Sequence, residues 1–103
     1  LRVRAGEPLD EIVLRSYITG AAHMGLSWVT SESLGVDESG EIHDLTIRSF
    51  GILRAIDTPA IEIVIEADDG PAVVASDAVF AAVAAAAWRT AGFASTWPTA
   101  AVL

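Results

Sequence analysis

The sequence predicts an α+β fold, a two-layer sandwich with two helices on one face of a mainly antiparallel three- or four-stranded sheet. Two stretches with helical spacing of apolar residues, and several short alternating runs between turn residues, point to this class. Their order is strand, helix, strand, strand, strand, helix, which favours two layers. A chain of 103 residues suits one core, so we expect a single domain spanning 1–103.

The first helix is predicted over residues 11–29. Apolar residues recur there at spacings of three and four, and Asp10 stands before them as an N-cap. Gly20 and Gly25 fall inside this helix, where each costs about 1 kcal/mol relative to alanine. We therefore expect a close backbone contact at this helix.

The second helix is predicted to begin at a cap formed by Ser76 or Asp77 and to run to about Ala91, with Gly92 as its stop. It is nearly all alanine, so it should lie tightly on the sheet. Trp28 and Trp88 lie on the large-residue stripes of the two helices, and we expect both to be substantially buried. Residues 93–103 are expected to form an irregular strap.

The strands are predicted from alternation and β-branched residues. Residues 31–36 and 41–47 form a hairpin closed by the turn at residues 37–40, where Gly40 can take the left-handed conformation. Residues 1–4 and 61–65 are further strands. Residues 48–59 have no clean period and form a long irregular connection.

Charge and composition exclude several functions. Six Lys and Arg against fourteen Asp and Glu give a net charge of -8, which repels phosphate backbones and anionic lipids. We therefore expect neither nucleic-acid nor membrane partners. The chain has no cysteine, so it has no thiolate metal site or iron–sulfur ligand, which fits a cytoplasmic protein. No stretch resembles a targeting segment, and we expect the chain to be a piece of a longer protein.

Candidate catalytic groups are few. His23 and His43 each lack a partner at metal-ligand spacing, and we interpret both as structural or surface residues. The acidic turns at residues 37–40 and 68–69 lack the spacing of a calcium loop. No serine lies in a nucleophile motif, and no glycine-rich phosphate loop is present. The residues alone therefore predict no catalytic residue and no metal ligand.

Four segments, in order, resemble motifs of the molybdenum-cofactor-binding large subunit of the xanthine dehydrogenase, aldehyde oxidase and carbon monoxide dehydrogenase family. Residues 17–27 (YITGAAHMGLS) are similar to Q-x-x-G-x-x-x-x-G-L-G, and residues 30–42 (TSESLGVDESGEI) to the T-E-E-L-x-x-D-x-x-G-x-x hairpin. Residues 49–61 (SFGILRAIDTPAI) take the place of D-Y-K-I-P-T-x-x-D-I-P-x-I. Residues 69–74 (DGPAVV) take the place of G-E-P-P before the last helix.

The resemblance implies the C-terminal part of a molybdenum hydroxylase large subunit. In that family a molybdopterin cofactor carries the chemistry, a glutamate acts as base, and electrons leave through iron–sulfur clusters and a flavin. The family's cofactor-contacting glutamine corresponds to Tyr17 here, and its catalytic glutamate corresponds to Gly70. Neither the Tyr17 phenol nor Gly70 can perform the role of the family's residue. A shifted alignment brings Asp68 or Asp69 to the glutamate position. Their side chains are shorter than that of glutamate, so they could act as the base only if the backbone were shifted. No catalytic residue is carried over, and the cofactor-binding residues stay unassigned.

Two functions follow as expectations. The first is a C-terminal domain of a molybdenum-dependent oxidoreductase, inactive alone, whose partners are the rest of the large subunit and iron–sulfur and flavin subunits. The second is a degenerate structural or subunit-interaction module of the same ancestry. In both cases the isolated chain should bind no molybdopterin. It should retain apolar surface that makes it a homo-oligomer.

Overall fold

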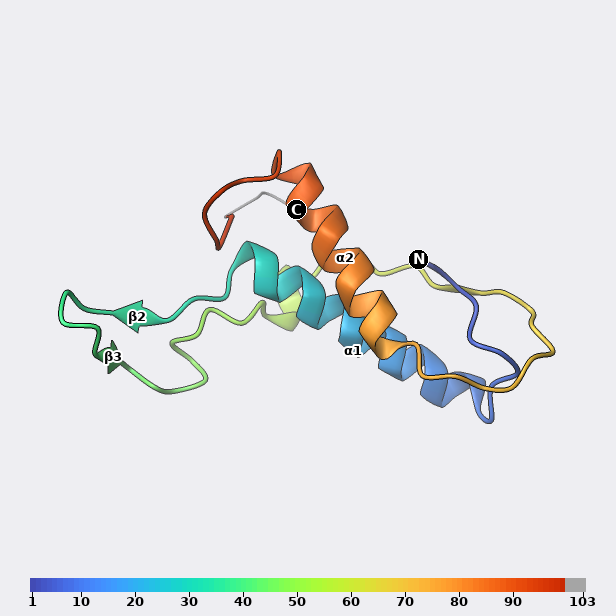
Figure 1. The fold of residues 1–103 in the computed structure, drawn as a ribbon. Helices are drawn as coiled ribbons and strands as arrows, with labels where there is room; N and C mark the ends of the chain where they lie inside the picture. The colour runs from blue at the N-terminus through green and yellow to red at the C-terminus, as the bar shows by residue number, and fades with distance from the viewer. Residues whose placement is uncertain (100–103) are drawn as a thin grey trace.

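Two crossing helices form the centre of the computed structural model, and an extended arm leaves them at one side (Figure 1). The structure describes residues 1–99. The radius of gyration is 16.0 Å and the principal extents are 54 × 28 × 24 Å. A compact domain of this length has a radius of gyration of about 13 Å, so this chain is extended. The elements in chain order are β1 (Arg2–Val3), α1 (Glu11–Thr30), β2 (Gly35–Val36), β3 (Ile42–His43), the short 3₁₀ turn η1 (Ala55–Asp57), β4 (Val64–Ile65) and α2 (Ser76–Thr90).

Helix α1 begins and ends close to where the sequence predicts. The Asp10 side chain accepts hydrogen bonds from the backbone N–H groups of Ile12 (2.8 Å) and Val13 (3.1 Å), which confirms it as the N-cap. These bonds satisfy two of the four N–H groups that a helix start leaves without partners. The contact expected at the helix glycines exists at Gly25, which lies against the main chain of α2 at Phe80.

Helix α2 confirms the predicted stop but not the predicted cap. Gly92 follows the helix with a φ of +66°, and its N–H donates to the Arg89 carbonyl. The N-cap residue is Ala75, and no side chain caps the helix there. The prediction of Ser76 or Asp77 as the cap was therefore wrong: Ser76 is already the first helical residue. The predicted strap is irregular from residue 93 to 99, and its last part, residues 100–103, lies outside the described residues.

The predicted sheet does not form, so the two-layer sandwich was the wrong fold class. Within residues 1–99 there are two separate two-stranded sheets. Strand β1 pairs with β4 in parallel, with Arg2 opposite Val64, and β2 pairs with β3 antiparallel, with Gly35 opposite His43. The hairpin is real but shorter than predicted. It stays apart from β1 and β4 because its chain returns directly to α1, where the Leu53 N–H donates to Ser27 Oγ.

The core lies between α1, α2 and the β1–β4 pair. Ile18 and Val29 of α1 are completely buried, and the small residues of both helices let them approach closely. The tryptophans do not join this core: Trp28 is 46% exposed and Trp88 is 37% exposed, so the prediction of their burial was wrong. They form instead an aromatic cluster on the rim, in which the ring centroids of Trp28 and Phe80 lie 5.4 Å apart with the rings tilted by 31°. The buried apolar side chains are Val3, Ala5, Ile18, Ala21, Ala22, Val29, Val79, Ala84 and Ala87.

Candidate functional site

The two positions that the resemblance singles out lie in different surroundings. Tyr17 stands on α1, 64% exposed, and lines an apolar groove. Gly70 closes a tight turn, in which its N–H donates to Asp68 Oδ1 (3.0 Å) and its carbonyl accepts from the Glu7 N–H (2.9 Å). Gly70 is not among the residues that line the groove. The described residues therefore do not bring these two positions into one pocket.

The groove beside Tyr17 has a volume of about 530 Å³ and lies between the first half of α1 and the segment before α2. Two apolar side chains at its edge are strongly exposed, Leu9 at 99% and Val74 at 82%, whereas Ile18 at its floor is buried. Among the described residues of its lining, Asp10 is the one with a charge, and its carboxylate is occupied in capping α1. The remaining side chains of the lining are those of Ala5, Pro8, Val13, Leu14, Ile18, Ala72, Val73, Ala75 and Ser76. Such a lining favours contact with another apolar surface.

This groove does not fit molybdopterin. The cofactor carries a phosphate and a polar ring system, so a site for it needs positive charge or several N–H donors. The lining has no Lys, Arg or His, and its charged group is the negative Asp10. The groove thus supplies apolar contacts beside Tyr17 and, among the described residues that line it, no positive charge for the cofactor's phosphate.

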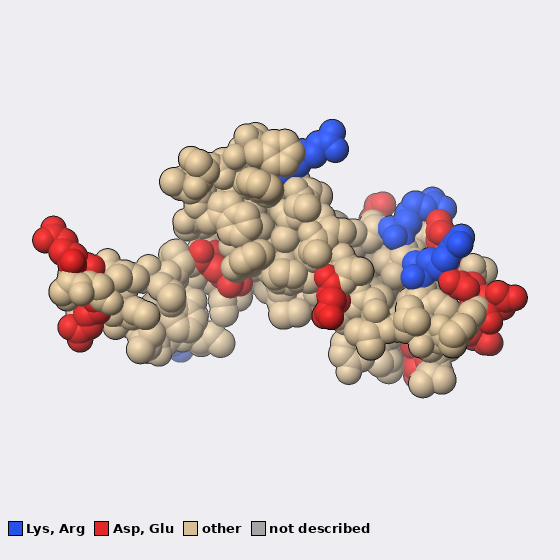
Figure 2. Space-filling model, in the orientation of Figure 1, with Lys and Arg blue, Asp and Glu red and all other residues tan. Residues whose placement is uncertain are grey.

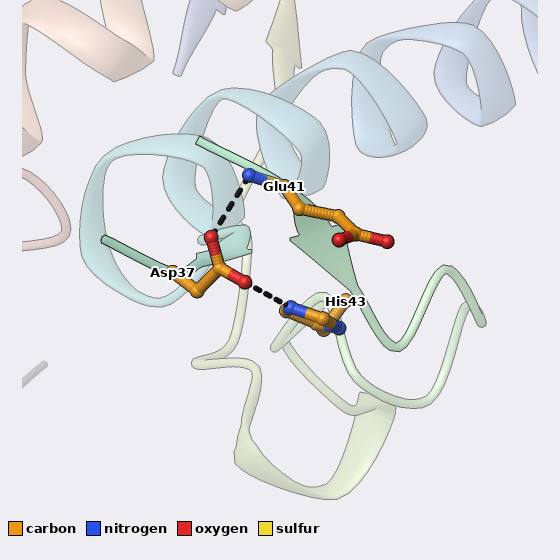
Figure 3. Close-up of side chains that lie close together, drawn as sticks. All are labelled: Asp37, Glu41 and His43. Atoms are coloured by element: carbon orange, nitrogen blue, oxygen red, sulfur yellow. Dashed lines mark hydrogen bonds and ion pairs between the residues drawn. The ribbon is translucent and has the colours of Figure 1, made fainter. Parts of the chain in front are cut away.

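A cluster of metal-ligating side chains lies at the tip of the hairpin arm, formed by Asp37, Glu41 and His43 (Figure 3). One ligand atom from each residue lies within 4.8 Å of the others. His43 Nε2 is 2.6 Å from Asp37 Oδ2. The other oxygen, Asp37 Oδ1, accepts from the Glu41 N–H (3.0 Å) and from the N–H and hydroxyl of Ser39 (2.9 and 2.7 Å). Asp37 therefore closes the turn and contacts the opposite strand with one carboxylate.

Sequence reasoning considered Asp37 and His43 separately and did not bring them together. The hairpin register supplies the missing step: with Gly35 opposite His43, residue 37 lies opposite residue 41, and residue 43 lies two positions further along. Side chains two apart on a strand share a face. The predicted hairpin contains all three residues of the cluster. Recognising that they share a face requires the strand register as well as the position of the turn.

Charged side chains lie at both ends of the molecule and also on its central part (Figure 2). Figure 2 shows acidic side chains at the tip of the arm, and arginines beside acidic groups at the opposite end. Hydrogen bonds from His43, Ser39 and the Glu41 N–H lower the pKa of Asp37 from 3.8 to about 2. At the other end, the hydrogen bond and charge of Arg2, followed by those of Arg4, lower the pKa of Glu66. The pairs of Arg2 and Arg4 with Glu66 connect β1 and the residue after it to the residue that follows β4.

His23 has a structural role in the connection between the hairpin and η1. Its Nε2 lies 2.7 Å from the Leu53 carbonyl oxygen. One turn further along α1, the buried Ser27 Oγ accepts from the Leu53 N–H (2.9 Å) and donates to Glu32 Oε1 (2.6 Å). Both the N–H and the carbonyl group of Leu53 therefore contact side chains of α1. The predicted irregular connection is anchored here.

Comparisons with protein-family models, with curated proteins and with solved structures give no match. Neither helix within residues 1–99 has the length and apolar character needed to cross a membrane.

Proposed function

We propose that this chain is the C-terminal packing domain of a molybdenum-dependent oxidoreductase large subunit and supplies surface instead of catalytic groups. The four ordered motif resemblances support the family. The observation that carries the packing role is the apolar groove beside Tyr17, with Leu9 and Val74 almost fully exposed. An exposed apolar surface of this kind marks a contact with another protein surface.

The extended shape supports the same role. A radius of gyration of 16.0 Å leaves little of the chain in an interior of its own. Within residues 1–99, the nine buried apolar residues include five alanines and no aromatic residue. Such a core provides limited hydrophobic stabilisation, so contact with the rest of a large subunit would add what the chain lacks.

One observation favours the second function, a structural module of the same ancestry that has lost the chemistry. Tyr17 and Gly70 replace the two cofactor-facing residues of the family, and the groove lining offers no positive charge to a phosphate. A polypeptide in which the cofactor site has degenerated in this way keeps the packing role without molybdenum.

Metal analysis of the complete gene product that contains this chain distinguishes the two functions. The first function predicts that molybdenum copurifies with the protein in stoichiometric amount, and the second predicts none. The packing role is tested separately with Leu9→Asp and Val74→Asp, which should impair assembly or solubility of that gene product. Ile56→Asp is the matched control, because Ile56 is 85% exposed and is not in the groove lining. Assembly that is equally normal in all three variants would refute the packing role, whatever the molybdenum content.

A further inference from the structure

The hairpin arm has no core to hold it. Every residue from 33 to 49 is exposed, and the ladder between β2 and β3 contains only two residue pairs. Leu34, Val36 and Ile42 are 54%, 56% and 42% exposed, so apolar contacts contribute little. A lone two-stranded hairpin is marginally stable in water. Besides this ladder, the contact between Asp37 and His43 links the two strands at the tip, so a further cross-strand restraint there would stabilise the arm.

We propose that the tip of the arm binds a first-row divalent cation, best represented by Zn²⁺, through Asp37, Glu41 and His43. These residues come from both sides of the turn, so one ion would connect the two strands (Figure 3). Two carboxylate oxygens and one imidazole nitrogen form a three-ligand set of the kind that zinc accepts with water in the fourth position. The imidazole disfavours Ca²⁺, which takes oxygen ligands in larger number.

The donor atoms need only small movements to reach zinc geometry. Ligands of a tetrahedral zinc ion lie about 3.3 Å apart, given bonds of about 2.0–2.1 Å. The three donors already lie within 4.8 Å of one another, and their side chains are exposed, so rotation of Glu41 can close the set. Three donors hold Asp37 Oδ1, and Oδ2 lies 2.6 Å from His43 Nε2, so a bound ion would replace the Asp37–His43 hydrogen bond with one bond to each of these two atoms.

Binding should also order the arm. An ion that binds the paired hairpin better than the open one shifts the equilibrium toward the paired form. The cluster lies beyond the C-terminal end of α1, whereas the apolar groove lies at the N-terminal half of that helix. The arm's ion site is thus independent of the molybdenum proposal and of the groove.

The test is titration of the metal-free chain with ZnCl₂, followed by calorimetry and by amide NMR. We expect one ion per chain, chemical-shift changes confined to residues 35–43, and slower amide exchange in the hairpin after zinc is added. Glu41→Gln and His43→Gln should each weaken binding by more than about tenfold, since loss of an outer-shell partner alone costs about 10–100-fold. Glu41→Gln is the decisive variant, because it keeps the backbone N–H that Asp37 accepts from and so keeps the turn.

Glu38→Gln is the matched control. It removes one negative charge from the same turn, but Glu38 is not part of the cluster, so zinc affinity should stay within about twofold. Equal weakening by Glu38→Gln and Glu41→Gln would show diffuse attraction by acidic groups and would overturn the proposal. Calcium binding as tight as zinc binding, or no zinc binding at millimolar concentration, would overturn it as well.

Discussion

Gly25 of α1 lies so close to Phe80 of α2 that a Cβ at Gly25 would stand 2.6 Å from the Phe80 carbonyl oxygen. The same Cβ would stand 3.3 Å from the Ala84 backbone nitrogen. The clash is with main chain, which cannot rotate away as a flexible side chain can. Gly25 therefore sets the distance between the two helices, and this contact offsets the helix propensity that glycine loses.

The first prediction compares the two glycines of α1. Gly25→Ala should destabilise the chain by about 1–3 kcal/mol, the usual cost of forcing extra volume into a packed interface. Gly20→Ala is the matched control, because a Cβ built there has no described atom within 4 Å beyond its chain neighbours and the nearby backbone of its own helix. It should stabilise the chain by up to about 1 kcal/mol through helix propensity. Urea unfolding measures both, and destabilisation by both variants would contradict the assigned helix contact.

The second prediction concerns the anchor of the long connection. Ser27→Ala removes the acceptor of the Leu53 N–H and the donor to Glu32 Oε1 in a buried position. A buried group left without its partner costs about 1–3 kcal/mol, so the urea midpoint should fall accordingly. Ser33→Ala, at an exposed position, should change stability by less than about 0.5 kcal/mol. Equal effects of the two variants would show that the Leu53 anchor is unimportant.

The third prediction is a pH dependence of the hairpin. The pKa of Asp37 is lowered from 3.8 to about 2 in the folded arm, so the ionised carboxylate stabilises the folded form. That stabilisation is complete above about pH 4 and is lost as the pH falls toward 2. Amide NMR should show the Ser39 and Glu41 N–H signals move toward unfolded positions across this range.

Asp37→Asn should abolish that transition, because the amide does not titrate. Glu38→Gln should leave it unchanged, since Glu38 contributes nothing to the lowered pKa of Asp37. A hairpin that keeps its signals down to pH 2 in the unsubstituted chain would contradict the role of Asp37 in closing the turn.

The helices were predictable from the sequence because their signals are local. The three- and four-residue spacing and the Asp10 cap define α1, and Gly92 defines the end of α2, each within a few residues. The sheet was not predictable in this way. Strand β1 pairs with β4, 62 positions later, and nothing in residues 1–4 indicates that partner or its parallel direction.

The hairpin shows a second limit. Alternation of Leu34 and Val36 with smaller or polar residues predicts a half-buried strand, yet both side chains are exposed. Alternation shows which face of a strand is apolar, but it does not show whether another part of the chain packs on that face. The Asp37–His43 contact, by contrast, followed from the turn once the register was known. Sequence reasoning therefore predicted the turn at residues 37–40 but no metal ligand, because the pairing of Asp37 with the strand of His43 depends on the register.

The last prediction is self-association of the isolated chain through the groove beside Tyr17. Leu9 and Val74 are 99% and 82% exposed, and burying a side chain of this size contributes about 1.5–3 kcal/mol, so the uncovered groove should pair with that of a second chain. The net charge of -8 opposes this contact at long range, and added salt screens it beyond about 10 Å at 0.1 M. Sedimentation equilibrium should therefore show dimers or higher oligomers at high protein concentration, and more of them as salt rises. Leu9→Asp and Val74→Asp should shift the chain toward monomer while Ile56→Asp does not. If the chain stayed strictly monomeric at millimolar concentration, the apolar groove would be stable in contact with water. There would then be no reason to expect a protein partner at the groove.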